Sequence, residues 1–103
     1  MDSEQLIPTN ELCTYYNMEY SFIRSLQDSG LIEVTTIEEQ GFIHPGQLQQ
    51  LEKFARLHYD LDINLPGIEA IAHLLERVNT MQHEMAMLRN RLRFYERIGI
   101  DQL

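Results

Sequence analysis

A long uninterrupted segment near the C-terminus places the strongest constraint on the fold. After Gly67, residues 68–97 contain no proline or glycine, so nothing in this stretch breaks a helix. Its apolar residues recur at alternating steps of three and four, an average of about 3.5 that is typical of a coiled-coil seam. A small head could cover only the first turns, so the seam predicts pairing with a second copy. The expected dimer interface comprises Ile71, Leu74, Val78, Met81, Met85, Leu88, Leu92 and Tyr95.

The residues before this segment predict a small helical head. Pro8 and Thr9 open a first helix, for which Thr9 or Asn10 is a suitable N-cap because its side-chain oxygen can accept an orphan amide. Asn17 should end that helix, since Asn tolerates the left-handed conformation. A second helix is expected from about residue 19 to 29. Its apolar stripe consists of Phe22, Ile23 and Leu26.

A short hairpin, which we call the wing, and a third helix complete the predicted head. Residues 31–34 and the pair Phe42-Ile43 indicate two strands, joined by a polar, acidic turn at 35–41. A third helix is expected over about 45–60, and Asn64 should cap the last helix. The sequence therefore predicts a mainly α protein. Residues 1–63 form a winged helix-turn-helix head, and residues 64–103 form a long C-terminal helix for dimerisation.

The charge of the head argues against a polyanion as its partner. The chain carries 16 acidic against 8 basic side chains, a net charge of −8. Between Glu19 and Gln40 there are five acids and one base, Arg24, which gives a net charge of −4. A DNA-reading helix and wing need Lys or Arg against the phosphates, because counterion release supplies most non-specific affinity. The acidic head is better suited to a basic protein surface.

Several classes of function lack the residues they need. The single cysteine, Cys13, leaves no intramolecular disulfide or multi-cysteine metal cluster. The histidines form no H-E-x-x-H motif, and no glycine-rich phosphate loop occurs. We therefore expect no enzyme activity, catalytic residue, metal, cofactor or small-molecule ligand. We also expect no signal peptide and no membrane span, and hence a cytoplasmic protein.

Three short motifs resemble the MerR-type DNA-binding fold. They are Asn10-Glu11-Leu12-Cys13-Thr14, Phe22-Ile23-Arg24 and Gly30-Leu31-Ile32. The MerR pattern usually continues after its Arg with Tyr-Tyr, whereas this chain has Ser25-Leu26. That departure argues against ordinary MerR-type DNA binding.

A closer resemblance is to the CbpM-like chaperone-modulator family, over about residues 8–95. It is carried by Arg56-Leu57-His58-Tyr59-Asp60-Leu61, Asn64-Leu65-Pro66-Gly67-Ile68-Glu69 and Leu88-Arg89-Asn90-Arg91-Leu92. The resemblance implies a MerR-like head that binds the J-domain of a DnaJ-like (CbpA-type) co-chaperone. Such binding would inhibit the work of that co-chaperone with a DnaK-type chaperone. The implied partner-binding residues are Asp28, Glu33, Glu38, Glu39, Arg56 and His58.

The same residues also permit other interpretations. The acids could belong to a solvated hairpin, Arg56 could be an ordinary surface charge, and His58 could pack at the edge of the core. A MerR-family transcriptional regulator that binds DNA as a dimer is the main alternative function. A dimeric adaptor with an unidentified partner is another. In the DNA-binding case the contacts would come from Tyr20, Ser21 and Arg24.

Overall fold

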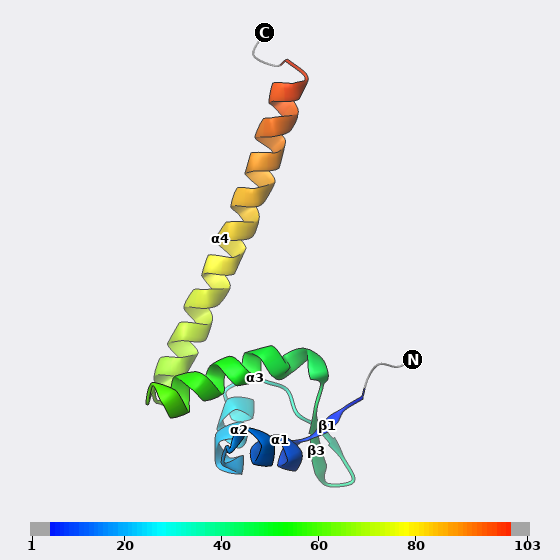
Figure 1. The fold of residues 1–103 in the computed structure, drawn as a ribbon, viewed down its shortest axis with the longest axis vertical. Helices are drawn as coiled ribbons and strands as arrows, with labels where there is room; N and C mark the ends of the chain where they lie inside the picture. The colour runs from blue at the N-terminus through cyan, green and yellow to red at the C-terminus, as the bar shows by residue number, and fades with distance from the viewer. Residues whose placement is uncertain (1–4, 100–103) are drawn as a thin grey trace. The chain divides into compact units, whose positions relative to one another are not determined.

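The computed structural model describes residues 5–99 and divides the chain between Ala70 and Ile71 into two units. We call the described residues up to Ala70 the head, and we describe each unit by itself. Along the head, β1 (Ile7–Pro8) leads into α1 (Thr9–Tyr16) and α2 (Tyr20–Asp28). The strands β2 (Thr35–Ile37) and β3 (Gln40–Ile43) follow, and α3 (Leu48–Ala55) lies after them (Figure 1). The predicted mainly α class with a small wing is confirmed.

The core of the head is formed by the predicted helical stripes and by β3. Phe22, Ile23 and Leu26 of α2 are all buried, as are Leu51 and Phe54 of α3. The other buried apolar side chains of the described residues are Leu12, Met18, Ile32, Ile43 and Ile68. Each helix thus turns one apolar face inward, which is what the spacing of its apolar residues predicts.

The ends of the first helices follow the sequence in part. Asn17 has a left-handed φ of 58° and ends α1 as predicted. The predicted side-chain N-cap is wrong, because Pro8 occupies the cap position and no side chain bonds the first amides. Thr9 is instead the first helical residue, and its side chain is buried.

The wing is shifted along the chain from its predicted place. Residues 31–34, expected to form a strand, precede the hairpin, and β2 covers Thr35–Ile37 from the segment expected to be a turn. The strands form an antiparallel sheet of order β1-β3-β2, in which Ile37 pairs with Gln40 and Ile7 with Ile43. The turn is therefore only two residues long. The shift has a physical reason, because the backbone of Glu33 is bound by a side chain rather than by a neighbouring strand.

The third predicted helix has the expected extent but changes its winding twice. It begins as a 3₁₀ turn, η1 (Pro45–Gln47), continues as α3 and ends as a π-helical turn, η2 (Arg56–Asp60). In that last turn the amide of Leu61 donates to the carbonyl of Arg56, five residues earlier, at 3.2 Å. π-turns occur often at functional sites, and η2 lines the pocket described below.

The last helix, α4 (Leu65–Arg97), matches its prediction closely. Asn64 caps it, since the amide of Gly67 donates to Asn64 Oδ1 at 2.9 Å. The division between the units falls inside α4, several residues after the expected boundary at 63/64. The fully buried Ile68 belongs to the head. From His73 to Ile98 every side chain is exposed. No helix of the described chain is long and apolar enough to cross a membrane.

Candidate partner-binding surface

The four predicted acidic residues come from three separate segments of the head. Asp28 ends α2, Glu33 lies in the loop before β2, and Glu38 and Glu39 form the turn of the wing. All four side chains are exposed, so each carboxylate is available to a partner. They do not form one tight cluster along the chain, because the helix, loop and turn each contribute separately.

The loop that carries Glu33 is fixed by one glutamine. The Gln47 side chain accepts a hydrogen bond from the Glu33 amide and donates one to the Glu33 carbonyl, both at 2.8 Å. The side-chain amide group of Gln47 therefore replaces the two backbone partners that a neighbouring strand would have offered to Glu33. This places Glu33 on the surface while the adjacent Ile32 is buried.

The turn of the wing has an unusual backbone. Glu38 and Glu39 have φ values of 51° and 69°, the left-handed conformations that a two-residue hairpin turn requires at both centres. Gly is usual there because it lacks the Cβ that is strained in this region, and Asn because its short polar side chain can hydrogen-bond locally. The hairpin thus holds two glutamates at its tip at some cost in stability. The neighbouring Ile37 is 47% exposed.

Arg56 and His58 both lie on η2 but in different surroundings. Arg56 is exposed. His58 is half-buried and stacks on Phe22, with ring centroids 4.5 Å apart and planes 10° apart. Its Nδ1 lies 3.0 Å from the carbonyl oxygen of Ile63, which accepts the hydrogen bond. The ring is therefore occupied within the head, and its contact with a partner stays a prediction.

Tyr59 links the π-turn to the start of α2. Its ring packs edge-on against Phe22, at a centroid distance of 5.3 Å, and against His58, at 4.7 Å. Its hydroxyl accepts a hydrogen bond from the Glu19 amide at 3.0 Å. That amide precedes α2, where backbone amides lack helical partners. The aromatic cluster thus fixes η2 against the helix-turn-helix.

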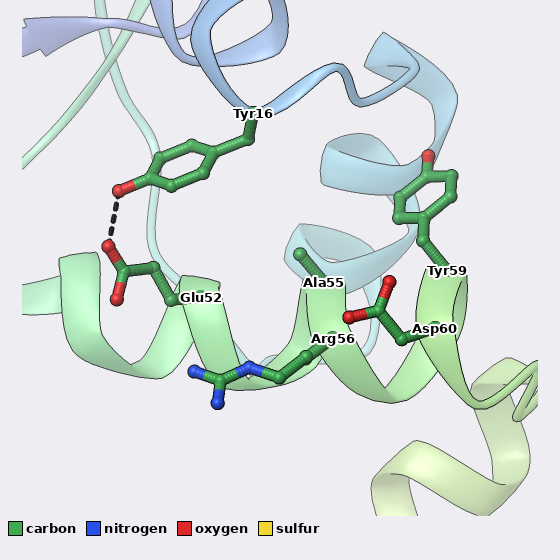
Figure 2. A pocket seen from close by; sticks show the side chains of 6 residues that line it. All are labelled: Tyr16, Glu52, Ala55, Arg56, Tyr59 and Asp60. Carbon is green, nitrogen blue, oxygen red and sulfur yellow. Dashed lines mark hydrogen bonds between the residues drawn. The ribbon is translucent and has the colours of Figure 1, made fainter.

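A pocket of about 260 Å³ opens beside this cluster. Figure 2 shows Tyr16 of α1 on one side and Tyr59 of η2 on the other, with Glu52 near the first tyrosine and Asp60 near the second. Ala55 lies between them, and Arg56 completes the lining. Of these six residues, only Arg56 is among the partner-binding residues predicted from the sequence.

One short hydrogen bond organises the first side of the pocket. The Tyr16 hydroxyl donates to Glu52 Oε2 at 2.5 Å, which joins α1 to α3 (Figure 2). This bond, together with desolvation and the Glu52 charge, raises the pKa of Tyr16 to about 12. Tyr16 therefore keeps its proton and remains a donor to Glu52 at neutral pH.

The residues of the alternative DNA interface are also accessible. Tyr20, Ser21 and Arg24 are exposed on α2, the second helix of the helix-turn-helix. Arg24 is the only base between Glu19 and Gln40. The geometry therefore leaves α2 free to contact a ligand, while the net charge of −4 on the segment from Glu19 to Gln40 opposes phosphate.

The predicted seam on α4 is exposed along most of its length. Ile71 is half-buried, whereas Leu74, Met85, Leu88 and Leu92 are each 50–61% exposed. The remaining seam residues, Val78, Met81 and Tyr95, are exposed as well. Such a continuous apolar stripe is typical of a surface that a partner covers.

Sequence reasoning missed the residues whose roles depend on distant partners. Gln47 acts on Glu33 across 14 positions, and Tyr16 meets Glu52 across 36. Neither pair has a recognisable spacing. The sequence offered one weak signal for such a contact, namely tyrosines near the ends of predicted helices in an acidic head. Within residues 5–99 no group of three metal-ligating side chains could hold a metal ion.

Comparison with known protein families gives a match over most of the chain. Residues 7–90 match the profile of the family described as MerR HTH family regulatory protein. No curated protein and no solved structure matches the chain.

Proposed function

The chain belongs to the MerR helix-turn-helix family of regulatory proteins, and we propose that it regulates by binding a protein rather than by catalysis. The proposed partner is the basic surface of the J-domain of a DnaJ-like, CbpA-type co-chaperone. Occupying that surface would keep the co-chaperone from working with a DnaK-type chaperone. The observation that carries the proposal is the charge of the elements that a helix-turn-helix head uses for contact, five acids against one base.

The exposed positions support a basic partner in preference to DNA. Asp28, Glu33, Glu38 and Glu39 all face solvent on α2, its following loop and the wing. Against DNA each would stand near a phosphate and oppose binding. Against a surface rich in Lys and Arg the same charges would speed encounter and set specificity.

The proposal includes a homodimer formed through α4. Most of the stability of a helix in a protein comes from packing of its apolar face rather than from helix propensity, and α4 covers little of its apolar stripe within one chain. A second copy of the same stripe would bury both. Dimerisation would place two acidic heads in one molecule and so allow two-site binding.

The alternative is a dimeric MerR-type transcriptional regulator. Its support is the exposure of Tyr20, Ser21 and Arg24 on α2. A selection of duplexes from a random pool at physiological salt separates the two functions. We expect weak, non-specific DNA binding only. Recovery of a palindrome bound at nanomolar affinity would favour the transcriptional regulator.

The direct test is surface plasmon resonance of the full chain against a purified J-domain. Reversal of Glu33, Glu38 and Glu39 to Lys should slow association by about tenfold or more at low salt, because like charges would then face each other. The difference should shrink at high salt, where exposed charges are screened.

The matched control reverses Glu69, Glu76 and Glu96 on α4, which are also exposed. It changes the net charge of the chain equally but leaves α2, the loop that follows it and the wing unaltered. If both triple variants slow association to the same degree, the effect belongs to net charge and the proposed surface is wrong. If neither wild type nor variant binds any J-domain, the proposed partner is wrong.

A further inference from the structure

We infer that the pocket between α1 and η2 receives the guanidinium group of an arginine side chain presented by a partner protein. The inference deepens the proposed function, because it names one chemical group of the basic partner and a second place on the head that binds it. It uses residues that lie outside the acidic wing. Its ligand is a single side chain, in keeping with a volume of about 260 Å³, which is below the range of about 300–1,000 Å³ usual for small-molecule sites.

The walls of the pocket offer two aromatic rings. Figure 2 shows Tyr16 and Tyr59 on opposite sides, with the space between them above Ala55. Both rings are held in place, Tyr16 by its bond to Glu52 and Tyr59 by the Glu19 amide and by Phe22. A planar guanidinium stacks well on aromatic faces and is more weakly hydrated than an ammonium group. Fixed rings therefore favour arginine over lysine.

The charge of the pocket selects a cation. Glu52 and Asp60 stand against a single base, Arg56. Glu52 uses only Oε2 for Tyr16, and neither the Asp60 nor the Arg56 side chain makes a hydrogen bond or ion pair with the described residues. Figure 2 shows the Arg56 guanidinium directed away from Tyr59 and Asp60. A second guanidinium could therefore meet free carboxylate oxygens on both sides.

The small side chain of Ala55 keeps the pocket open. Ala55 is half-buried at the end of α3, immediately before the π-turn. The turn then displaces Arg56 to Asp60 from the register that a continued α-helix would give them. A larger side chain at position 55 would extend into the space between the tyrosines and exclude a ligand.

The test is an NMR titration of the uniformly labelled full chain with N-acetyl-arginine amide. We expect saturable shifts of the amides of Tyr16, Glu52, Ala55 and Tyr59, with weaker affinity for N-acetyl-lysine amide. N-acetyl-citrulline amide has nearly the same shape without the charge and should leave these amides unchanged. Equal binding of the citrulline derivative would overturn the inference, as would equal shifts of the same amides by N-acetyl-aspartate amide.

Two variants address the pocket itself. Ala55→Leu should abolish binding by filling the space, and the double change Glu52→Gln with Asp60→Asn should weaken it about tenfold by removing two exposed or half-exposed charges. Glu38→Gln on the wing removes an exposed carboxylate elsewhere and should have no effect. Unchanged affinity in both pocket variants would refute the site. Thermal unfolding of each variant establishes that it is folded.

The outcome is separable from that of the proposed function. If the arginine derivative binds but no J-domain does, the pocket stands and the proposed partner fails. If a J-domain binds and the derivative does not, the partner stands and the pocket fails.

Discussion

The head buries its apolar side chains within itself, whereas α4 beyond residue 72 displays them to solvent. Ile23, Leu26 and Leu51 are at most 1% exposed, while Leu74 and Leu88 are each 61% exposed. Both units are helical, and in both the apolar residues recur at helical spacing. Periodicity alone therefore identifies an apolar face of a helix but not what covers it. Whether that face is covered by the same chain or by a second copy depends on which other segments of the chain pack against it.

The largest effect should come from a charge in the seam. Leu88→Glu would place two unpaired carboxylates in the dimer interface, and we expect the dimer dissociation constant to rise by at least about 1,000-fold. Sedimentation velocity measures this change. Asn90→Glu, on the same helix but off the seam, is the control and should stay dimeric. A Leu88→Glu variant that remains dimeric at micromolar concentration would show that the seam is misplaced.

A matched substitution in the head should act on the folding of one chain. Leu51→Ala removes a fully buried side chain from α3, and we expect the free energy of unfolding to fall by about 3 kcal/mol. Urea denaturation monitors the loss. Leu74→Ala on α4 should change the unfolding of the head by much less, because Leu74 is exposed there. Equal losses in the two variants would contradict the contrast between the units.

Removal of the Tyr16 hydroxyl tests a polar contact within the head. Tyr16→Phe should lower the free energy of unfolding by about 1 kcal/mol at pH 7, the usual net value of such a bond. Because the pKa of Tyr16 is raised from 10.0 to about 12, the stabilisation is fully present below pH 10. It is lost as the pH rises towards 12.

The pH dependence provides the measurement for Tyr16. Urea denaturation of the wild type and of Tyr16→Phe should be measured between pH 7 and 12. The difference between their free energies of unfolding should narrow above pH 10. Tyr15→Phe is the control, since Tyr15 is 80% exposed and its loss should cost little. A difference that stays constant up to pH 12 would show that the Glu52 bond does not hold the Tyr16 proton.

The smallest effect concerns the tip of the wing, and it should be stabilising. Glu39 has a φ of 69°, which glycine adopts without strain. Glu39→Gly should raise the free energy of unfolding by about 0.5–1 kcal/mol. Thr36→Gly in the adjoining strand β2 should lower it instead, since glycine weakens strands. Thermal unfolding of both variants would decide, and a destabilised Glu39→Gly protein would refute the argument from backbone strain.

The parts of the fold that could be predicted from the sequence are those governed by neighbouring residues. The stripe of Phe22, Ile23 and Leu26, the left-handed Asn17 and the Asn64 cap all follow from local spacing and local backbone chemistry. The strand expected at residues 31–34 was wrong because Gln47, from a later segment, binds the backbone of Glu33. The composition of residues 31–34 is typical of a strand, but it does not show that the Gln47 side chain competes with a neighbouring strand for this backbone.

The candidate site was less predictable than the fold. Exposure of the acids follows from their charge, so Glu33, Glu38 and Glu39 could be selected at once. The pocket depends on Tyr16 and Glu52, which meet only after α1 and α3 have packed, and on a π-turn with no sequence signature. His58 was selected for a partner, yet its ring stacks on Phe22 inside the head.

The distribution of tyrosines gives the molecule its own optical labels. The chain has five tyrosines and no tryptophan. Tyr15, Tyr16, Tyr20 and Tyr59 belong to the head, while Tyr95 alone lies on the exposed part of α4, at the end of the predicted seam. Ultraviolet emission from Tyr95 could therefore be isolated by difference against Tyr95→Phe. It would report the environment of the helix without any added dye, while the other four rings report the head.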